Sequence, residues 1–392
     1  MKIKYISLIL LVFVVQFTFS QYKQLSNKAE ISIITAGPGE VLYEGFGHSA
    51  IRVKDASFDT VYNYGFFDFN APNFYLNFTK GKLLYKLESY PFYYFVRSYQ
   101  KDKRWIKEQI LNLNQQEKQE FYEYLENNAK PENATYLYDP FFNNCATILR
   151  EITDTILKNN VTFNEDHIIE NLTFRQLMNN EIHWNTWGSF GINLALGSKL
   201  DEVTSPKQHM YLPDYVYSGF KNATVNRDSN TLNLIKKEQY ILKFNELKTK
   251  PSFFNPFLVF SFILFIGLLI TFKDVKGKQR TKWFDFILFF STGIIGVIIV
   301  FLWFFTNHST TPANYNFLWA FAPNLIVAFF IVKYKVKLWV KTYTKTLIIL
   351  MLVIPIIWIG KIQLLPFASV PFIILLFIRY LFLSKFLLSS KK

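Results

Sequence analysis

The last third of the chain alternates long apolar runs with short basic connections, a pattern typical of a membrane-embedded bundle. A helix needs about 20 residues to cross a hydrocarbon core roughly 30 Å thick. We expect such helices at 253–272, 284–305, 317–333, 345–360 and 366–384. Residues 253–392 are therefore predicted to form an all-α bundle of five transmembrane helices, which excludes a fold wholly surrounded by water.

Charges between these runs predict the topology. The connections 273–282 and 333–345 each carry five cations, whereas 306–316 carries none. Cations accumulate on the cytoplasmic side of a membrane. We therefore expect a multi-pass protein of the inner (cytoplasmic) membrane, with residues 21–252 in the periplasm and the C-terminus in the cytoplasm. Arg379 lies near the cytoplasmic end of the last run, and we expect its side chain to reach the interface.

The N-terminus agrees with export. Residues 1–20 place two Lys before an apolar stretch that ends with Thr18 and Ser20, the layout of a secretory signal peptide. We expect cleavage before Gln21, and an uncleaved signal anchor is the alternative. Both interpretations export the domain that follows. Because no Cys stands at the end of this segment, we do not expect the chain to be a lipoprotein itself.

The distribution of charge excludes nucleic acid as a partner. The chain has a formal charge of +14. Residues 21–252 carry 26 basic and 27 acidic residues, whereas 253–392 carry 15 basic and two acidic ones. A nucleic-acid surface needs its cations clustered on one folded face. Here the polar part of the chain is close to neutral, and the excess lies between apolar runs.

The exported part is predicted to be a mixed α+β domain at 21–220, joined to the membrane by a polar, helical stalk at 221–252. Period-two patterning indicates antiparallel strands and helical spacing indicates helices. The strands are expected at 30–35, 49–53 and 61–66, and the helices at 103–128 and 145–157. Strands and helices in separate runs are typical of α+β folds.

Cys145 is the only cysteine in the chain, so it cannot form an intrachain disulfide. One alternative is a buried small hydrophobic residue. However, Asn143 and Asn144 are good N-cap residues directly before a periodic segment, which places Cys145 in the first turn of a helix. Helix N-termini are among the settings that lower a cysteine pKa from about 8.5 to about 3.5–7.5. Cys145 is therefore the candidate nucleophile.

A thiolate nucleophile needs a base, and His48 is the candidate among five histidines. It lies in EGFGHSAIRV, where Gly45 and Gly47 permit close approach of backbone and substrate. The remaining histidines are expected to be surface or hydrogen-bonded polar residues: His167, His183, His209 and His308.

A third group should fix the tautomer of the His48 ring. The next predicted strand, VYNYG, offers Asn63 as an amide partner. Tyr62, Asp59 and Asp68 remain alternatives, because the register of a hairpin cannot be read from one sequence. Such a site needs neither a cofactor nor a metal, and we expect none.

A cysteine at a helix N-terminus with a histidine on a strand resembles the papain-like NlpC/P60 superfamily. The order His before Cys is similar to its circularly permuted branch, which includes lecithin:retinol acyltransferase-like (LRAT-like) enzymes. More closely, six strings followed by membrane helices resemble the Lnb family of Bacteroidota: YEGFGHSAIRV, VYNYGFFDF, EQILNLN, YDPFFNNCATILR, WGSFGINLALGSKLDE and MYLPDY. The resemblance covers nearly the whole mature chain and implies a permuted papain-like fold for the exported domain.

The Lnb resemblance also implies a reaction. A thiol-dependent acyltransferase would move an acyl chain from a membrane phospholipid to the α-amine of the N-terminal diacylglyceryl cysteine of a lipoprotein. Diacylated lipoproteins would be the acceptors. By position, Cys145 matches the cysteine of the family and His48 its histidine, whereas Asn63 has no comparably clear match. The backbone N–H of Cys145 is the expected oxyanion donor.

Two other functions remain open. The same Cys–His pair could cleave peptide or amide bonds in the cell wall, as many NlpC/P60 relatives do, although a wall hydrolase usually needs only a tether. The other is a membrane-anchored binding module in which Cys145 is structural. The connection 306–316 is expected at the outer surface, where His308, Asn314 and Asn316 could position a lipid headgroup; the alternative is an uncharged interfacial loop with a helix-starting Asn.

Overall fold

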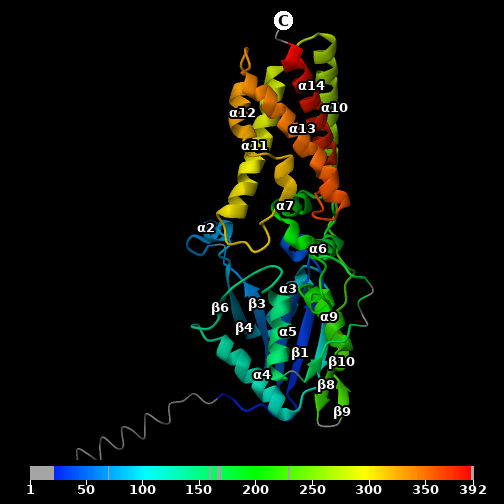
Figure 1. The fold of residues 1–392 in the computed structure, drawn as a ribbon. Coiled ribbons are helices and arrows are strands. Elements are labelled where there is room, and N and C mark those ends of the chain that lie inside the picture. Colours follow the sequence, from blue (N-terminus) through cyan, green and yellow to red (C-terminus); the bar gives the residue numbers. More distant parts are fainter. Residues whose placement is uncertain are drawn as a thin grey trace, which may run out of the picture.

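A computed structural model describes residues 22–68, 70–158, 160–165, 168, 170–227 and 230–389. The predicted signal peptide at 1–20 and His167 lie outside these residues. Figure 1 shows a sheet domain at one end of the molecule and a bundle of helices at the other. The last helix of the bundle ends on the side away from the sheet domain (Figure 1).

A seven-stranded antiparallel sheet is the frame of the sheet domain, in the order β10-β5-β1-β2-β3-β4-β6. Its strands are β1 (Glu30–Ala36), β2 (His48–Asp55), β3 (Phe58–Phe66), β4 (Leu84–Pro91), β5 (Ile106–Leu111), β6 (Thr135–Leu137) and β10 (Ile235–Leu242). A small second sheet holds β7 (Val161–Thr162), β8 (Thr224–Arg227) and β9 (Asn230–Asn233). The three strands predicted from period-two patterning are confirmed as β1, β2 and β3.

Helix α5 (Cys145–Ile156) packs across β2 and β3 and carries the main core. Its Leu149 and Ile152 are buried in one cluster with Ile51 and Val53 of β2. This confirms the helix predicted at 145–157.

The other helices of the sheet domain are α2 (Phe74–Thr79), α3 (Phe92–Lys101), α4 (Gln115–Asn128), α6 (Phe174–Glu181), α7 (Trp187–Ala195), α8 (Pro206–His209) and α9 (Pro213–Asn222), with the 3₁₀ helices η1 (Leu42–Glu44) and η2 (Ser198–Asp201).

The single helix predicted at 103–128 is wrong in its first half. Strand β5 occupies 106–111 and pairs with β1 on one side and β10 on the other. Helix α4 begins only after Asn114, whose side chain accepts the N–H of Glu117 at 2.9 Å in a capping box. Ile106 and Ile110 fit a helical period and a strand alternation equally well, so pairing with distant strands decides the structure.

The helical stalk predicted at 221–252 is also wrong. Residues 224–242 form β8, β9 and β10, and β10 pairs with β5 as an edge strand of the large sheet. The sheet domain therefore extends to Leu242, past the predicted boundary at 220. Residues 243–255 contain no helix or strand and lead directly into the bundle. The polar, Lys-rich composition that suggested a stalk is also usual on edge strands.

Four of the five predicted membrane segments are confirmed as long apolar helices: α10 (Pro256–Lys276), α11 (Lys282–Phe304), α13 (Leu338–Ile359) and α14 (Val370–Ser389). The segment predicted at 317–333 is not one long helix. It is divided into η3 (Tyr315–Leu318) and α12 (Asn324–Ile331), with Pro323 between them. Among the described residues, only the four long helices have the length and composition to cross a membrane.

The divided segment packs closely against α11, beside which Figure 1 shows α12. A Cβ on Gly293 would lie 2.1 Å from the backbone nitrogen of Leu325, and a Cβ on Gly296 would lie 2.1 Å from the backbone oxygen of Ala320. Only glycine permits such an approach of two backbones. Pro323 has no N–H to donate to a helix, so the chain turns where it meets the two glycines.

The prediction that Arg379 reaches the membrane interface is wrong. Its side chain is fully buried, with Nη2 2.7 Å from Oδ2 of Asp274 and Nε 2.6 Å from Oδ1 of Asp285. Arg280 joins this cluster, because its Nη1 lies 3.5 Å from Oδ2 of Asp285. Two cations and two carboxylates therefore balance one another and join α14 to α10 and α11.

Candidate functional site

Cys145 is the first residue of α5, as predicted. The side-chain oxygen of Asn144 accepts the N–H groups of Ala146 at 2.8 Å and Thr147 at 2.9 Å. The Asn144 amide donates to the backbone oxygen of Tyr211 at 2.9 Å. The capping residue is thus held from two sides and fixes the start of the helix. Cys145 itself is only 9% exposed.

His48 is the first residue of β2, beside the start of α5. Gly47 precedes it with φ of +72°, and a Cβ there would lie 2.9 Å from the backbone oxygen of Ala36. The His48 ring interacts electrostatically with Cys145, and its Nε2 lies 2.6 Å from Oδ1 of Asn63. An amide oxygen only accepts, so Nε2 carries the hydrogen and Nδ1 is left to face the thiol.

Asn63 of β3 is held in turn by Tyr90 of β4, since its Nδ2 lies 3.0 Å from the Tyr90 hydroxyl oxygen. The three alternatives for this position have other partners. Tyr62 donates to Glu126, Asp59 pairs with Arg52 at 2.6 Å, and exposed Asp68 accepts the N–H of Asn70 at 2.8 Å. The structure therefore brings together Cys145, His48 and Asn63.

The surroundings of Cys145 and His48 favour the charged form of both. Burial raises the pKa of the Cys145 thiol, but the charge and hydrogen bond of His48, with the N–H groups of Ser49 and Cys145, outweigh it and leave this pKa below its ordinary value. Burial lowers the pKa of His48, but the charge and hydrogen bond of Cys145 and the hydrogen bond of Asn63 outweigh it, so that pKa is raised. A thiolate beside an imidazolium can attack a carbonyl and protonate the leaving group.

Aromatic rings line the site. Tyr138 and Cys145 both lie next to Gly65, where a Cβ would be 3.9 Å from atoms of each residue. Tyr85 stacks on Tyr138 with ring centroids 4.3 Å apart, and Phe95 lies 6.4 Å from the His48 ring. These rings were not predicted as part of the site, because the pairing of β3, β4 and β6 that gathers them depends on contacts between distant residues.

The outer connection of the bundle, 306–316, docks beside the nucleophile. The Ser309 hydroxyl donates to the carboxylate of Asp139, whose Oδ1 accepts the N–H of Phe141 at 2.9 Å in the turn before Cys145. Farther along the connection, the N–H of Gly197 donates to the backbone oxygen of Thr310 at 2.8 Å. The site thus lies directly against the membrane bundle.

Asn314 and Asn316 are not placed to position a lipid headgroup, and the alternative of a helix-starting Asn is confirmed, because Asn314 caps η3. Both are fully buried. Asn314 Nδ2 donates to the backbone oxygen of Leu194 at 2.8 Å, and Asn316 Nδ2 to that of Asn193 at 3.3 Å. They hold the bundle to α7, so the string WGSFGINLALGSKLDE, to which the sequence analysis assigned no role, contains part of the interface between the two domains.

The other described histidines lie outside the Cys–His–Asn cluster. His183 Nδ1 accepts the N–H of Asn185 at 3.1 Å, which agrees with a hydrogen-bonded polar residue. The ring of His209 is buried 5.1 Å from that of Tyr215, and the ring of His308 lies 6.5 Å from that of Phe78. Among the described residues, no group of three His, Cys, Asp or Glu side chains could hold a metal ion.

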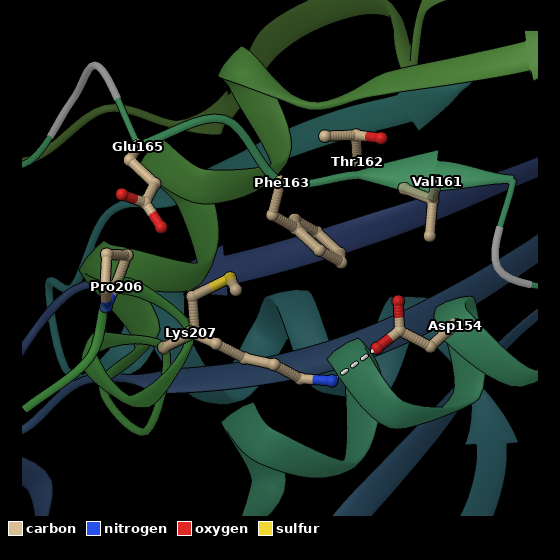
Figure 2. Close-up of a pocket in the computed structure, with 8 residues that line it drawn as sticks. Asp154, Val161, Thr162, Phe163, Glu165, Pro206 and Lys207 are labelled. Atoms are coloured by element: carbon tan, nitrogen blue, oxygen red, sulfur yellow. Dashed lines mark hydrogen bonds and ion pairs between the residues drawn. The ribbon is translucent and has the colours of Figure 1, made fainter.

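A separate hollow of 290 Å³ lies toward the other end of α5. Figure 2 shows Lys207 reaching across it to Asp154, with Nζ 2.7 Å from Oδ2. Asp154 follows Cys145 by about 13 Å along the helix axis, at 1.5 Å per residue. The hollow is therefore not part of the site at Cys145.

The fold and the site define a membrane-integral protein whose N-terminal α+β domain places a Cys–His–Asn cluster against its transmembrane bundle. The family model of the Lnb N-terminal periplasmic domain matches residues 18–180, and that of the Lnb transmembrane domain matches residues 248–391. The chain belongs to the Lnb family, which confirms the predicted resemblance. Membership implies an enzyme with a periplasmic domain. No curated protein and no solved structure matches the chain.

The Asn63→Ala variant tests the third member of the cluster. We expect kcat on a soluble ester to fall by about 10²-fold, because the His48 ring loses the group that orients it. Tyr62→Phe is the matched control, since Tyr62 neighbours Asn63 but donates to Glu126 instead. Steady-state rates of both purified variants measure the difference. Equal rates for Asn63→Ala and the wild type would remove Asn63 from the site.

Proposed function

We propose that the chain is a thiol-dependent lipoprotein N-acyltransferase with Cys145 as nucleophile and His48 as acid and base. The placement of Cys145 at the start of α5 beside His48, whose ring is held by Asn63, carries this proposal in a chain of the Lnb family. The acyl donor is a membrane phospholipid, and the acceptor is the α-amine of the N-terminal diacylglyceryl cysteine of a lipoprotein. The contact between the bundle and the sheet domain supports this proposal, because the bundle keeps Cys145 near the membrane, in which both proposed substrates are anchored.

In the first step, the Cys145 thiolate attacks the ester carbonyl of the phospholipid. A C–S bond forms, the ester C–O bond breaks, and His48 gives its proton to the departing alkoxide, which leaves as a lysophospholipid. The oxyanion that forms on the carbonyl needs preorganised donors. We assign the backbone N–H of Cys145 as one donor and that of Ser49, which approaches the same sulfur, as the second.

In the second step, the lipoprotein amine attacks the thioester. A C–N bond forms, the C–S bond breaks, and neutral His48 takes a proton from the amine. The thiolate and the imidazolium are thereby restored. Asn63 is a positioning residue in both steps, because its oxygen holds Nε2–H of His48 and so keeps Nδ1 directed at the reacting groups.

This function fits a particular fold and topology. We infer that the sheet domain is a circularly permuted papain-like domain, since its histidine strand precedes its cysteine helix and the two meet at the site. We also infer the inner membrane as its location and a cytoplasmic C-terminus. In support, the basic connections 273–282 and 332–337 and the end of α14 lie at the end of the bundle away from the periplasmic domain (Figure 1).

Mass spectrometry of lipoprotein N-terminal peptides tests the proposed function. Cells of a strain without a redundant enzyme carry the wild-type gene, Cys145→Ala or no copy. We expect the third acyl chain only with the wild type, because no other thiol in the chain can form the acyl-enzyme. Unchanged triacylation without the gene would overturn the function. Digestion of purified wall material by the wild-type protein would instead favour a wall hydrolase.

A further inference from the structure

Helix α2 exposes an apolar face that the sheet domain leaves uncovered. Tyr75, Leu76 and Phe78 are 71%, 51% and 48% exposed, and no residue of the helix is buried. Exposed Lys80 and Lys82 follow directly. Clustered large apolar side chains at a surface mark an interaction site. Tyrosine, apolar side chains and lysine together are the composition of segments that lie at a membrane interface.

Contacts with the bundle hold α2 at the level where membrane helix α11 ends. The N–H of Asn307, three residues beyond α11, donates to the backbone oxygen of Lys80 at 2.9 Å. Gly81 has φ of +72°, and a Cβ there would lie 2.5 Å from the backbone nitrogen of His308. Figure 1 shows α2 beside this end of α11. Helix α2, with its exposed apolar side chains, therefore lies beside the end of a membrane-spanning helix.

A line of aromatic rings connects α2 with the nucleophile. The ring centroids of Phe74 and Phe67 are 6.0 Å apart, those of Phe67 and Tyr85 are 5.0 Å apart, and those of Tyr85 and Tyr138 are 4.3 Å apart. Each separation lies within or near the usual contact range of aromatic pairs. Tyr138 and Cys145 both lie next to Gly65, where a Cβ would be 3.9 Å from atoms of each. The successive ring pairs therefore lead from α2 toward the thiol.

We propose that α2 docks into the outer leaflet of the bilayer and guides a lipid acyl chain along these rings to Cys145. The occupant is bilayer lipid, because the exposed apolar helix lies beside the end of a membrane-spanning helix and is followed by the cations Lys80 and Lys82, which suit anionic headgroups. The acyl-transfer part of the proposal rests on the proposed function. The docking of α2 does not, and it can be measured without catalysis.

A single fluorophore tests the docking. Cys145 is the only cysteine, so Cys145→Ser with Tyr75→Cys gives one labelling position for the environment-sensitive dye NBD. The full chain is reconstituted in vesicles of phosphatidylethanolamine and phosphatidylglycerol that contain a nitroxide lipid. We expect blue-shifted emission and strong quenching from position 75, because the dye lies among lipid chains.

Tyr93→Cys in the same background is the matched control. Tyr93 is 64% exposed, but it follows the end of β4 that is farther from α2 along the chain, and β4 is about 23 Å long at 3.3 Å per residue of strand. We expect water-like emission without quenching there. If position 75 behaves like position 93, α2 is not in the bilayer. If position 75 is shielded from water but unquenched, something other than lipid covers α2, and the proposal fails.

Donor selectivity tests the guiding of the chain. The Leu76→Ser, Phe78→Ser variant is compared with Tyr93→Ser, Tyr94→Ser for acylation of Cys145 by vesicle phospholipid and by soluble p-nitrophenyl butyrate. We expect the ratio of the two rates to fall about tenfold in the α2 variant only, because docking sets the local concentration of chains. An unchanged ratio would overturn the guiding role. A wild type that is never acylated would instead contradict the proposed function.

Discussion

The His48→Gln variant should form the acyl-enzyme about 10² to 10⁴ times more slowly than the wild type, the range expected for loss of a general acid and base. Glutamine can still accept and donate hydrogen bonds, but it cannot carry the proton that the departing alkoxide needs. The replacement of His48 also removes the positive charge that stabilises the Cys145 thiolate. Single-turnover rates with a soluble ester, measured from the release of its alcohol, report this step without the lipoprotein acceptor.

The pH dependence of Cys145 alkylation separates the two effects of His48. In the wild type the pKa of the thiol is lowered, so alkylation by iodoacetamide should persist at pH values below the ordinary range of a cysteine. In His48→Gln, burial still raises this pKa while the opposing charge is gone. The alkylation midpoint should therefore move upward, above its ordinary value, and the rate at neutral pH should fall.

His183→Gln is the matched control for this experiment. His183 is a histidine of the same domain whose Nδ1 accepts a hydrogen bond from Asn185 and which lies outside the cluster around Cys145. Its replacement should change neither the acylation rate nor the alkylation midpoint. If His48→Gln kept the wild-type midpoint and rate, the ion pair of Cys145 and His48 would not be the source of reactivity.

Local signals were sufficient to predict where the candidate nucleophile and the candidate base lie in the fold. Asn144 caps α5 as its residue type predicts, and Cys145 occupies the first turn because the cap fixes where the helix begins. His48 begins a strand whose alternating pattern was clear in the sequence. Where Cys145 and His48 lie depends on residues only a few positions away in the sequence, so a single sequence is enough to predict it.

The partner of His48 depends on geometry that one sequence does not contain. In the register of β2 and β3, Ile51 lies opposite Tyr62, so Asn63 reaches His48 diagonally rather than from directly across. The ladder of β3 with β4 also becomes irregular between Asn63 and Phe66, beside the start of α5. The register of β2 and β3 thus brings Asn63, rather than Tyr62, to the same face of the sheet as His48.

The membrane segment predicted at 317–333 shows how packing can override composition. Pro355 lies inside α13 without ending that helix, so a proline alone does not divide a membrane segment. At Pro323 the backbone also lies against Gly293 and Gly296 of α11, which leave no room for side chains. The two glycines and the proline are visible in the sequence, but their contact joins residues about 30 positions apart.

Arg379→Met should destabilise the membrane bundle by about 3 to 5 kcal/mol, the cost of leaving a buried ion pair without one partner. Arg379, Arg280, Asp274 and Asp285 form a balanced set of two cations and two carboxylates. Removing one cation leaves two buried carboxylates with a single counter-charge. The second replacement Asp274→Asn restores the balance, so the double variant should be more stable than Arg379→Met alone.

Thermal unfolding in detergent, followed by the loss of helical circular dichroism, measures both effects. Lys385→Met is the matched control, because it makes a similar change on the same helix at an exposed position. We expect it to unfold close to the wild-type temperature, since an exposed cation contributes little. If Arg379→Met unfolded at the temperature of Lys385→Met, the buried cluster would not hold α14 to α10 and α11. The bundle would then depend on apolar packing and the small-residue contacts of α11.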